Sequence, residues 1–286
     1  MITQLDTKTV YSFMDSLVSI KKYVQRAKDL GYKSLGMMDM DNLYGAYHFL
    51  EEAKAAGLQP LLGLEMEIYK DGNPLNLRLL ALDSQGYRNL MKISTLKMMN
   101  RQNWEDFQHL FKGLALIVPI FEGVDQLDLG LDFYVGVFPD TPRQELTRPV
   151  LPLHTVRYFE QGDLETLQML RAIRDNISLR EVGHLSSHEF LLAPESLEEA
   201  FAENFPESLT NLERLIADVH YEINTDLKLP RFNPERPAVE ELRELAETGL
   251  AKRGLAGTAY QVRLDQELDV IHQMGFDDYF LIVWDL

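Results

Sequence analysis

The chain has 286 residues, which predicts one large domain or two small ones, and it has no cysteine, which excludes disulfides and thiolate metal sites. Its net charge is −17. Non-specific DNA binding depends on cations that neutralise phosphates, so we expect a chain this acidic to hold DNA only through a local basic patch or through neighbouring domains. No signal-like N-terminus and no apolar run near the roughly 20 residues that cross a bilayer are present, which predicts a cytoplasmic protein.

Strand-like and helix-like segments alternate through the first half of the chain. A first helix is expected to begin after Ser16 as its N-cap and to end at Gly31. The segment 71–74 (DGNP) predicts a turn that pairs two flanking strands in antiparallel fashion. The expected strands cover 34–38, 61–69, 77–82, 114–120, 133–138 and 149–154, and further helices cover 42–56 and 86–100. This order predicts an α/β fold, in the form of an irregular (β/α) barrel.

Beyond about residue 160 the periodicity becomes mostly helical. Helices are expected over 163–174, 207–217, 240–252 and 263–274. Three prolines within 229–237 predict an extended connector and a domain boundary. The apolar run 279–284 should be buried, and its place near the end of the sequence suggests a piece of a longer protein. A C-terminal core strand of a complete protein is the alternative.

Several segments, in order along almost the whole chain, carry a family resemblance. They are 11–16 (YSFMDS), 38–46 (MDMDNLYGA), 57–65 (GLQPLLGLE), 86–90 (GYRNL), 229–232 (LPRF), and 267–276 (ELDVIHQMGF) with 279–283 (YFLIV). Together they resemble the start of the DNA polymerase III alpha subunits, the C-family replicative polymerases of bacteria. The last pair of segments looks like the beginning of the polymerase palm, which a free-standing PHP phosphatase would lack.

The resemblance implies a domain plan and a function for the longer protein. It implies a PHP (polymerase and histidinol phosphatase-like) domain over 1–228, with its barrel core roughly in 1–160 and a helical remainder, then a Pro-rich connector over 229–237 and the start of the palm over 238–286. The full-length protein would be a Mg²⁺-dependent DNA-directed DNA polymerase acting in DNA replication. Its polymerase carboxylates would lie further along, so no catalytic or cofactor-binding residue is expected here. The expected partners are the palm and thumb of the same chain and other replisome subunits, with DNA bound only through the full-length protein and no membrane.

The resemblance also points to a degenerate metal site. PHP domains with activity hold divalent metals with His, Asp and Glu and use them to activate water. The corresponding positions here are Gln4, Asp6, Lys8, Asp39, Met40, Glu65, Thr155 and Arg157. A lysine among metal ligands opposes metal binding directly. We therefore expect no bound metal, and we expect Lys8 and Arg157 to pair with the surviving carboxylates Asp6, Asp39 and Glu65.

Two other functions stay open on the sequence: a metal-dependent PHP phosphoesterase or 3′–5′ exonuclease, and a protein-binding module unrelated to replication. Of the remaining residues, Asp41 is expected to be the N-cap of the helix that begins at residue 42. His184 and His188 have the spacing of a metal pair but are better explained as part of a surface loop, and Met37 and Met38 as core packing.

Overall fold

The computed structural model describes residues 2–183, 186–221 and 230–286. The chain divides into two compact units, Met1–Ile223 and Asn224–Leu286. The predicted domain limits at 228 and 229 lie outside the described residues.

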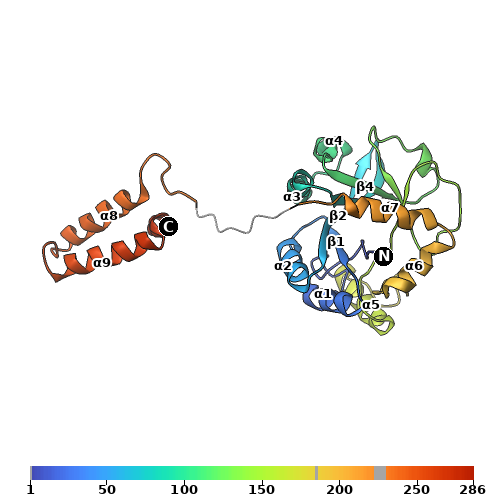
Figure 1. The fold of residues 1–286 in the computed structure, drawn as a ribbon, viewed down its shortest axis with the longest axis horizontal. Coiled ribbons are helices and arrows are strands. Elements are labelled where there is room, and N and C mark those ends of the chain that lie inside the picture. Colours follow the sequence, from blue (N-terminus) through green and yellow to red (C-terminus); the bar gives the residue numbers. More distant parts are fainter. Residues whose placement is uncertain (1, 184–185, 222–229) are drawn as a thin grey trace. The chain divides into compact units, whose positions relative to one another are not determined.

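A single six-stranded sheet forms the centre of the first unit (Figure 1). Its strands follow chain order: β1 (Ser34–Met40), β2 (Gln59–Lys70), β3 (Asn73–Ala81), β4 (Leu114–Pro119), β5 (Tyr134–Val137) and β6 (Val150–Pro152). β3 runs antiparallel to β2 and β4, and the other neighbours are parallel. The predicted turn joins β2 to β3, with Asp71 and Gly72 both at positive φ. This two-residue turn sets the register that places Glu65 opposite Arg78.

The N-terminal segment joins the two edges of this sheet. The amides of Gly36 and Met38 on β1 donate to the carbonyls of Gln4 (2.7 Å) and Thr7 (2.9 Å). On the other side, Lys8 and Val156 exchange hydrogen bonds with the continuation of β6, Lys8 N–H to the Val156 carbonyl and Val156 N–H to the Asp6 carbonyl, both at 2.9 Å. Residues 4–8 therefore close the sheet into an irregular barrel, which confirms the predicted fold class.

Closure requires a glycine on β1. A Cβ built on Gly36 would collide with the carbonyl oxygen of Leu5, so a residue with a side chain would push the N-terminal segment away. Since Gly36 also donates the hydrogen bond to Gln4, the close approach of the two backbones and the closure of the barrel depend on the same residue.

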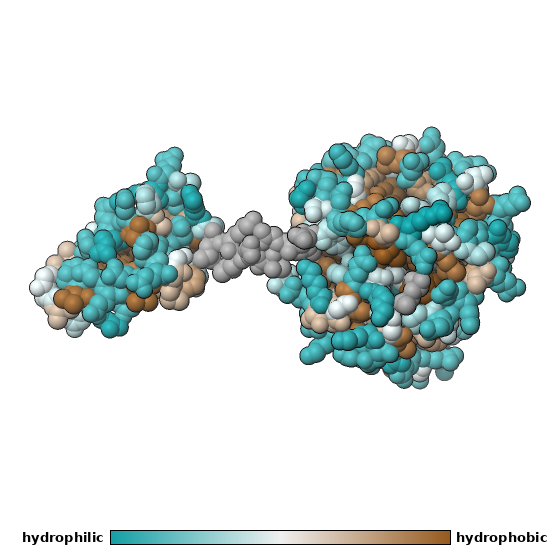
Figure 2. Space-filling view, viewed as in Figure 1, coloured by the Kyte–Doolittle hydropathy of each residue, from teal (hydrophilic) through white to brown (hydrophobic). Residues whose placement is uncertain are grey.

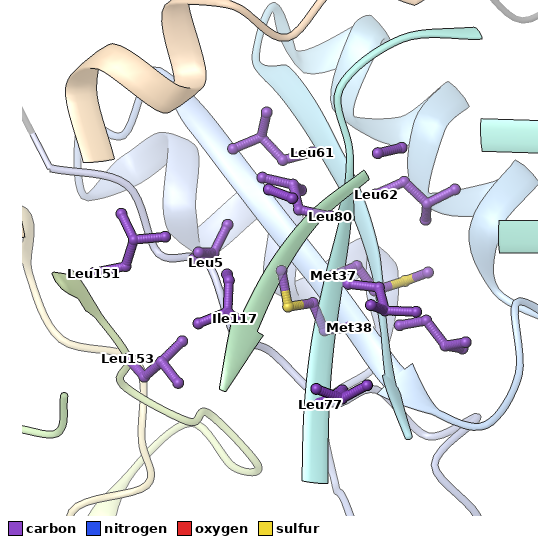
Figure 3. Close-up of a cluster of buried hydrophobic side chains, with 14 of the residues drawn as sticks. Leu5, Met37, Met38, Leu61, Leu62, Leu77, Leu80, Ile117, Leu151 and Leu153 are labelled. Carbon is purple, nitrogen blue, oxygen red and sulfur yellow. The ribbon is translucent and has the colours of Figure 1, made fainter. Parts of the chain in front are cut away.

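Helices surround the barrel. They are α1 (Ile20–Asp29), α2 (Ala46–Ala56), α3 (Ser84–Met98), the short α4 (Trp104–Phe107), α5 (Leu164–Asp175), α6 (Pro194–Ala202) and α7 (Pro206–Ala217). Because helices cover the outside and side chains fill the inside, β1 is buried along nearly its whole length. Figure 3 shows part of this core, with Leu5, Met37, Met38, Leu61, Leu62, Leu77, Leu80, Ile117, Leu151 and Leu153 labelled. The prediction that Met37 and Met38 are core residues is confirmed.

Two predicted helix starts are wrong. Helix α1 begins at Ile20 after Ser19, and the Ser16 hydroxyl instead donates to the carbonyls of Lys8 (2.7 Å) and Arg157 (3.0 Å). Helix α2 begins at Ala46, so Asp41 is not its N-cap. Asp41 has a φ of 58° and its carboxylate lies 3.3 Å from Lys97 Nζ. In both cases a contact distant in sequence, which local helix signals do not report, replaces the cap.

Over its described residues 230–286, the second unit contains three helices: α8 (Ala238–Lys252), α9 (Ala259–Gln273) and α10 (Asp277–Asp285). The run 279–284 is helical, which rules out the alternative of a C-terminal strand. Of that run, only Leu281 is buried, and Trp284 is 63% exposed. Figure 2 shows hydrophobic side chains at the surface of this unit. The prediction that the run is buried is therefore wrong within the second unit, because its three helices alone enclose little interior.

Candidate functional site

Six of the eight predicted site positions lie inside the barrel, on four segments of the chain. Gln4, Asp6 and Lys8 come from the N-terminal segment that closes the barrel, and Asp39 from β1. Glu65 lies on β2, and Thr155 on the continuation of β6. All six side chains are buried. The family resemblance therefore selected residues that the fold does bring together.

Lys8 lies at the centre of this group. Its side chain is fully buried, and its Nζ contacts Asp6 Oδ1 and lies 2.6 Å from Glu65 Oε2. The same ammonium donates to the carbonyl of Met38 at 2.6 Å. An ammonium group has three protons, and three acceptors meet it here. Lys8 is thus a buried cation held between two carboxylates.

Arg78, which was not among the predicted residues, is the second cation of the cluster. Its guanidinium lies 3.1 Å from Glu65 Oε1 through one terminal nitrogen, and 3.4 Å from Asp6 Oδ2 through Nε. Thr155 donates to Asp6 Oδ2 at 2.8 Å, and Asn76 donates to Glu65 Oε1 at 3.1 Å. The sequence held a signal for Arg78: it is the one charged residue in the apolar run 77–82, opposite Glu65 across the predicted turn.

Both carboxylates of the cluster are ionised at neutral pH. Burial by itself would raise the pKa of Asp6, but Lys8 and then Arg78 outweigh burial and hold that pKa far below its usual value. The pKa of Glu65 is also lowered. Burial and the nearby Asp6 carboxylate raise this pKa, but the opposite effect of Lys8 and Arg78 is larger. Asp6, Glu65, Lys8 and Arg78 therefore form an electrically neutral group of two anions and two cations, which we call the ion-pair cluster.

These residues do not fit a cluster of divalent metals. The space between Asp6 and Glu65 is taken by the ammonium of Lys8, and each carboxylate already faces two cations. The third carboxylate, Asp39, accepts hydrogen bonds from Thr9 N–H and Thr9 Oγ1, both at 2.6 Å, and from Ser12 Oγ at 2.7 Å. Across the described ranges 2–183, 186–221 and 230–286, no three His, Asp or Glu side chains group so as to hold a metal.

Arg157 does not play the role that was predicted for it. Its guanidinium contacts Asp15, and its Nε lies 3.4 Å from Glu189 Oε2. Arg171 and Arg174 also contact Asp15, at 2.7 and 3.0 Å. Arg157 thus pairs with two loop carboxylates and not with the predicted site carboxylates, and Arg78 is the arginine that pairs with Glu65. Met40, another predicted position, lies half-buried, and its amide donates to Ser12 Oγ at 3.2 Å.

Gln4 is part of a separate hydrogen-bonded group with His154. Gln4 Nε2 donates to the carbonyls of His154 (2.6 Å) and Asp6 (3.1 Å). The His154 ring lies 3.2 Å from Gln4 Oε1 through Nδ1 and 2.8 Å from the carbonyl of His188 through Nε2. Burial lowers the pKa of His154. His188 is exposed, and His184, at the spacing of a metal pair from it, lies outside the described residues.

Two family profiles match this chain. The PHP domain profile matches residues 4–128, which include β1 to β4 and the predicted site positions from Gln4 to Glu65. The profile described as the bacterial DNA polymerase III alpha NTPase domain matches residues 240–286, in the second unit. In the described ranges, none of the helices combines the length and the apolar character that spanning a membrane requires.

Curated relatives match over the entire chain. The DNA polymerase III subunit alpha of Streptococcus pyogenes serotype M1 is 48% identical over 288 residues, which cover 100% of this chain and 28% of the relative. The DNA polymerase III subunit alpha of Bacillus subtilis strain 168 is 28% identical over 323 residues, which cover 98% of this chain and 29% of the relative. A solved amidohydrolase from Chromobacterium violaceum overlaps 69% of this chain and 96% of its own at 10% identity and a TM-score of 0.36.

The chain thus spans a little over a quarter of the length of the relatives that it matches. The two profiles lie in the same order as the two units of the structure, with the PHP match on the barrel that holds the ion-pair cluster. Over its whole length the chain is similar to the N-terminal region of the bacterial DNA polymerase III alpha subunits, and its barrel carries the PHP domain match.

Proposed function

We propose that this chain is the N-terminal part of a replicative DNA-directed DNA polymerase, a nucleotidyltransferase that adds dNTPs to a primer under the direction of a template. The 48% identity over the whole chain supports this. On this proposal residues 1–228 are the PHP domain, 229–237 the connector and 238–286 the start of the palm. Mg²⁺ is required by the full-length protein, which works in the cytoplasm. The partners of this part are the palm and thumb of the same chain and other replisome subunits.

Within that polymerase, the barrel has a structural and docking role and is not itself an enzyme. The observation that carries this is the position of the Lys8 ammonium between Asp6 and Glu65. Two unit charges 4 Å apart interact by about 4 kcal/mol at an effective dielectric constant near 20. A divalent ion between these carboxylates would therefore be repelled strongly by Lys8 and by Arg78. The alternative of a metal-dependent phosphoesterase or 3′–5′ exonuclease needs the carboxylate oxygens that these cations occupy.

A bound-metal measurement tests the role of the barrel. The purified chain is incubated with Mn²⁺ and with Zn²⁺, dialysed, and analysed by mass spectrometry for retained metal. Far less than one ion per chain is expected, together with no hydrolysis of a DNA 3′ end. Stoichiometric metal that survives dialysis would contradict the proposal for the barrel. The polymerase assignment has its own test, which is primer extension by the full-length protein with Mg²⁺. A failure to extend the primer would contradict the polymerase assignment and leave the proposal for the barrel unaffected.

A further inference from the structure

The outer face of α1 is a basic surface on an acidic chain. Residues 19–33 contain five cationic residues and one acidic residue, a net charge of +4 within a chain of −17. Four of the five cations lie on α1 itself and line one groove; we call them the α1 basic surface: Lys21, Lys22, Arg26 and Lys28. The groove has a volume of about 720 Å³ and reaches Ala55 and Ala56 at the end of α2, which packs beside α1 (Figure 1). None of its residues belongs to the ion-pair cluster.

Acidic residues neutralise this surface only in part. Asp29 and Glu52 also line the groove. Asp29 accepts a hydrogen bond from Gln25 at 2.8 Å, and Glu52 lies 3.5 Å from His48 Nε2. Within the described part of the chain, neither carboxylate is within ion-pairing distance of a lysine of the α1 basic surface. The groove therefore keeps an excess of positive charge that is open to solvent.

Two of the four cations have local reasons for their position. The ammonium of Lys22 lies 4.5 Å from the centre of the Phe159 ring, a cation–π contact. Arg26 pairs with Glu160 at 2.8 Å. In contrast, Lys21 and Lys28 are exposed and have no ionic partner among the residues that the structure describes.

Lys21 is in addition unfavourable for its own helix. The positive end of the helix dipole lies in the first turn, where acidic residues are preferred and cations are destabilising. The first turn of α1 contains no acidic residue, and it contains Lys21 and Lys22. Residues that break such a local preference are expected at functional or strained sites.

We propose that the α1 basic surface binds the sugar–phosphate backbone of DNA. The proposal rests on the assignment of this chain to a replicative polymerase, since that places DNA beside it. Charge complementarity favours this ligand, because a phosphate backbone presents closely and regularly spaced negative charges to a groove lined by four cations. Flexible lysines that lack fixed partners suit a backbone bound without regard to sequence. The surface would hold DNA that the polymerase already engages, and it would add affinity without base specificity.

The test compares two double variants of the 286-residue chain with the wild type. Lys21→Gln with Lys28→Gln removes the two cations that have no partner in the described ranges and leaves Lys22 and Arg26 in their contacts. Lys92→Gln with Lys112→Gln is the matched control. Both lysines are exposed and lie elsewhere on the barrel, and their substitution changes the net charge by the same amount. Binding of fluorescent single-stranded and duplex DNA is followed by anisotropy over a range of salt concentrations. Thermal unfolding verifies that each variant is folded.

The expected result is a roughly three- to tenfold weaker binding by the Lys21/Lys28 variant at low salt, with little change in the control. The slope of log K against log salt should fall by about 0.7 to 0.9 for each phosphate that the variant no longer neutralises. Equal weakening in both variants, or in neither, would overturn the proposal, as would equally effective competition by poly-glutamate, which would indicate an acidic protein segment instead. Weaker DNA binding by the Lys21/Lys28 variant alone would support the surface even if the full-length protein failed to extend a primer.

Discussion

Glu65 on β2 and Arg78 on β3 face each other across an antiparallel pair, with 3.1 Å between Glu65 Oε1 and the Arg78 guanidinium. Neither residue lies on the N-terminal segment, yet both contact groups from it: Lys8 meets Glu65, and Arg78 meets Asp6. The cross-strand pair is thereby bound to the segment that closes the barrel. The ion-pair cluster holds three separate pieces of chain together at one point in the interior.

Removal of the central cation should be strongly destabilising. In Lys8→Met the carboxylates of Asp6 and Glu65 remain buried without their nearest positive charge. Breaking a buried pair in this way costs about 3 to 5 kcal/mol. Urea unfolding measures the change, with Lys33→Met as an exposed control that should shift the free energy of unfolding by less than about 0.5 kcal/mol. Equal stability of Lys8→Met and the wild type would show that Lys8 does not hold the cluster.

The cluster should also make the fold sensitive to acid. The folded-state pKa values of Asp6 and Glu65 are lowered from their ordinary values of 3.8 and 4.5, so the unfolded chain takes up these two protons first as the pH falls. The stabilisation is therefore complete above the ordinary values and is lost below about pH 5. Free energies of unfolding measured between about pH 7 and about pH 3 should show this decline. The slope should be shallower in Lys8→Met, and parallel curves would contradict the role of Lys8.

His154 should give a second pH dependence at a higher pH. Burial lowers its pKa from the ordinary value of 6.5, an effect that the His188 carbonyl and the nearby Asp6 oppose and the His188 side chain reinforces. The unfolded chain then binds the proton more readily, so stability decreases as the pH falls below about 6.5. His154→Gln should remove this component, whereas His109→Gln, at an exposed position, should leave it unchanged. A wild-type stability that is flat between about pH 7 and about pH 5.5 would contradict the prediction.

Gly36→Ala should open the barrel. The added methyl group meets the backbone of Leu5, which cannot move without breaking the hydrogen bond from Gly36 to Gln4. We expect the free energy of unfolding to fall by at least about 2 kcal/mol, and hydrogen exchange at the amides of Gly36 and Met38 to be faster. Gly162→Ala is the matched control, because its Cβ would meet no atom within 4 Å. An unchanged exchange rate at both amides would show that the N-terminal segment tolerates the displacement.

Much of the secondary structure was predictable from local patterns. The strands near 34, 61, 77, 114, 133 and 149 were found because apolar residues cluster there between turn residues. The turn predicted over 71–74 indicated the antiparallel pair, although Asn73 and Pro74 already belong to β3. The helices α3, α5, α7, α8 and α9 followed from their periodicity. The two helix starts predicted at Ser16 and Asp41 are wrong because these side chains, although suited to capping, contact other parts of the chain. Ser16 donates to the carbonyls of Lys8 and Arg157, and Asp41 pairs with Lys97.

The sequence by itself predicted that Lys8 pairs with the carboxylates Asp6 and Glu65, because the family pattern assigns all three positions to one site. Only the tertiary structure decided which cation completes that group. Arg157 is near it in the family pattern, but Asp15 and Glu189 lie closer to its guanidinium, while β3 carries Arg78 directly beside Glu65. A charge pairs with the nearest opposite charge in space, and distances between segments far apart in the sequence exist only after the chain has folded.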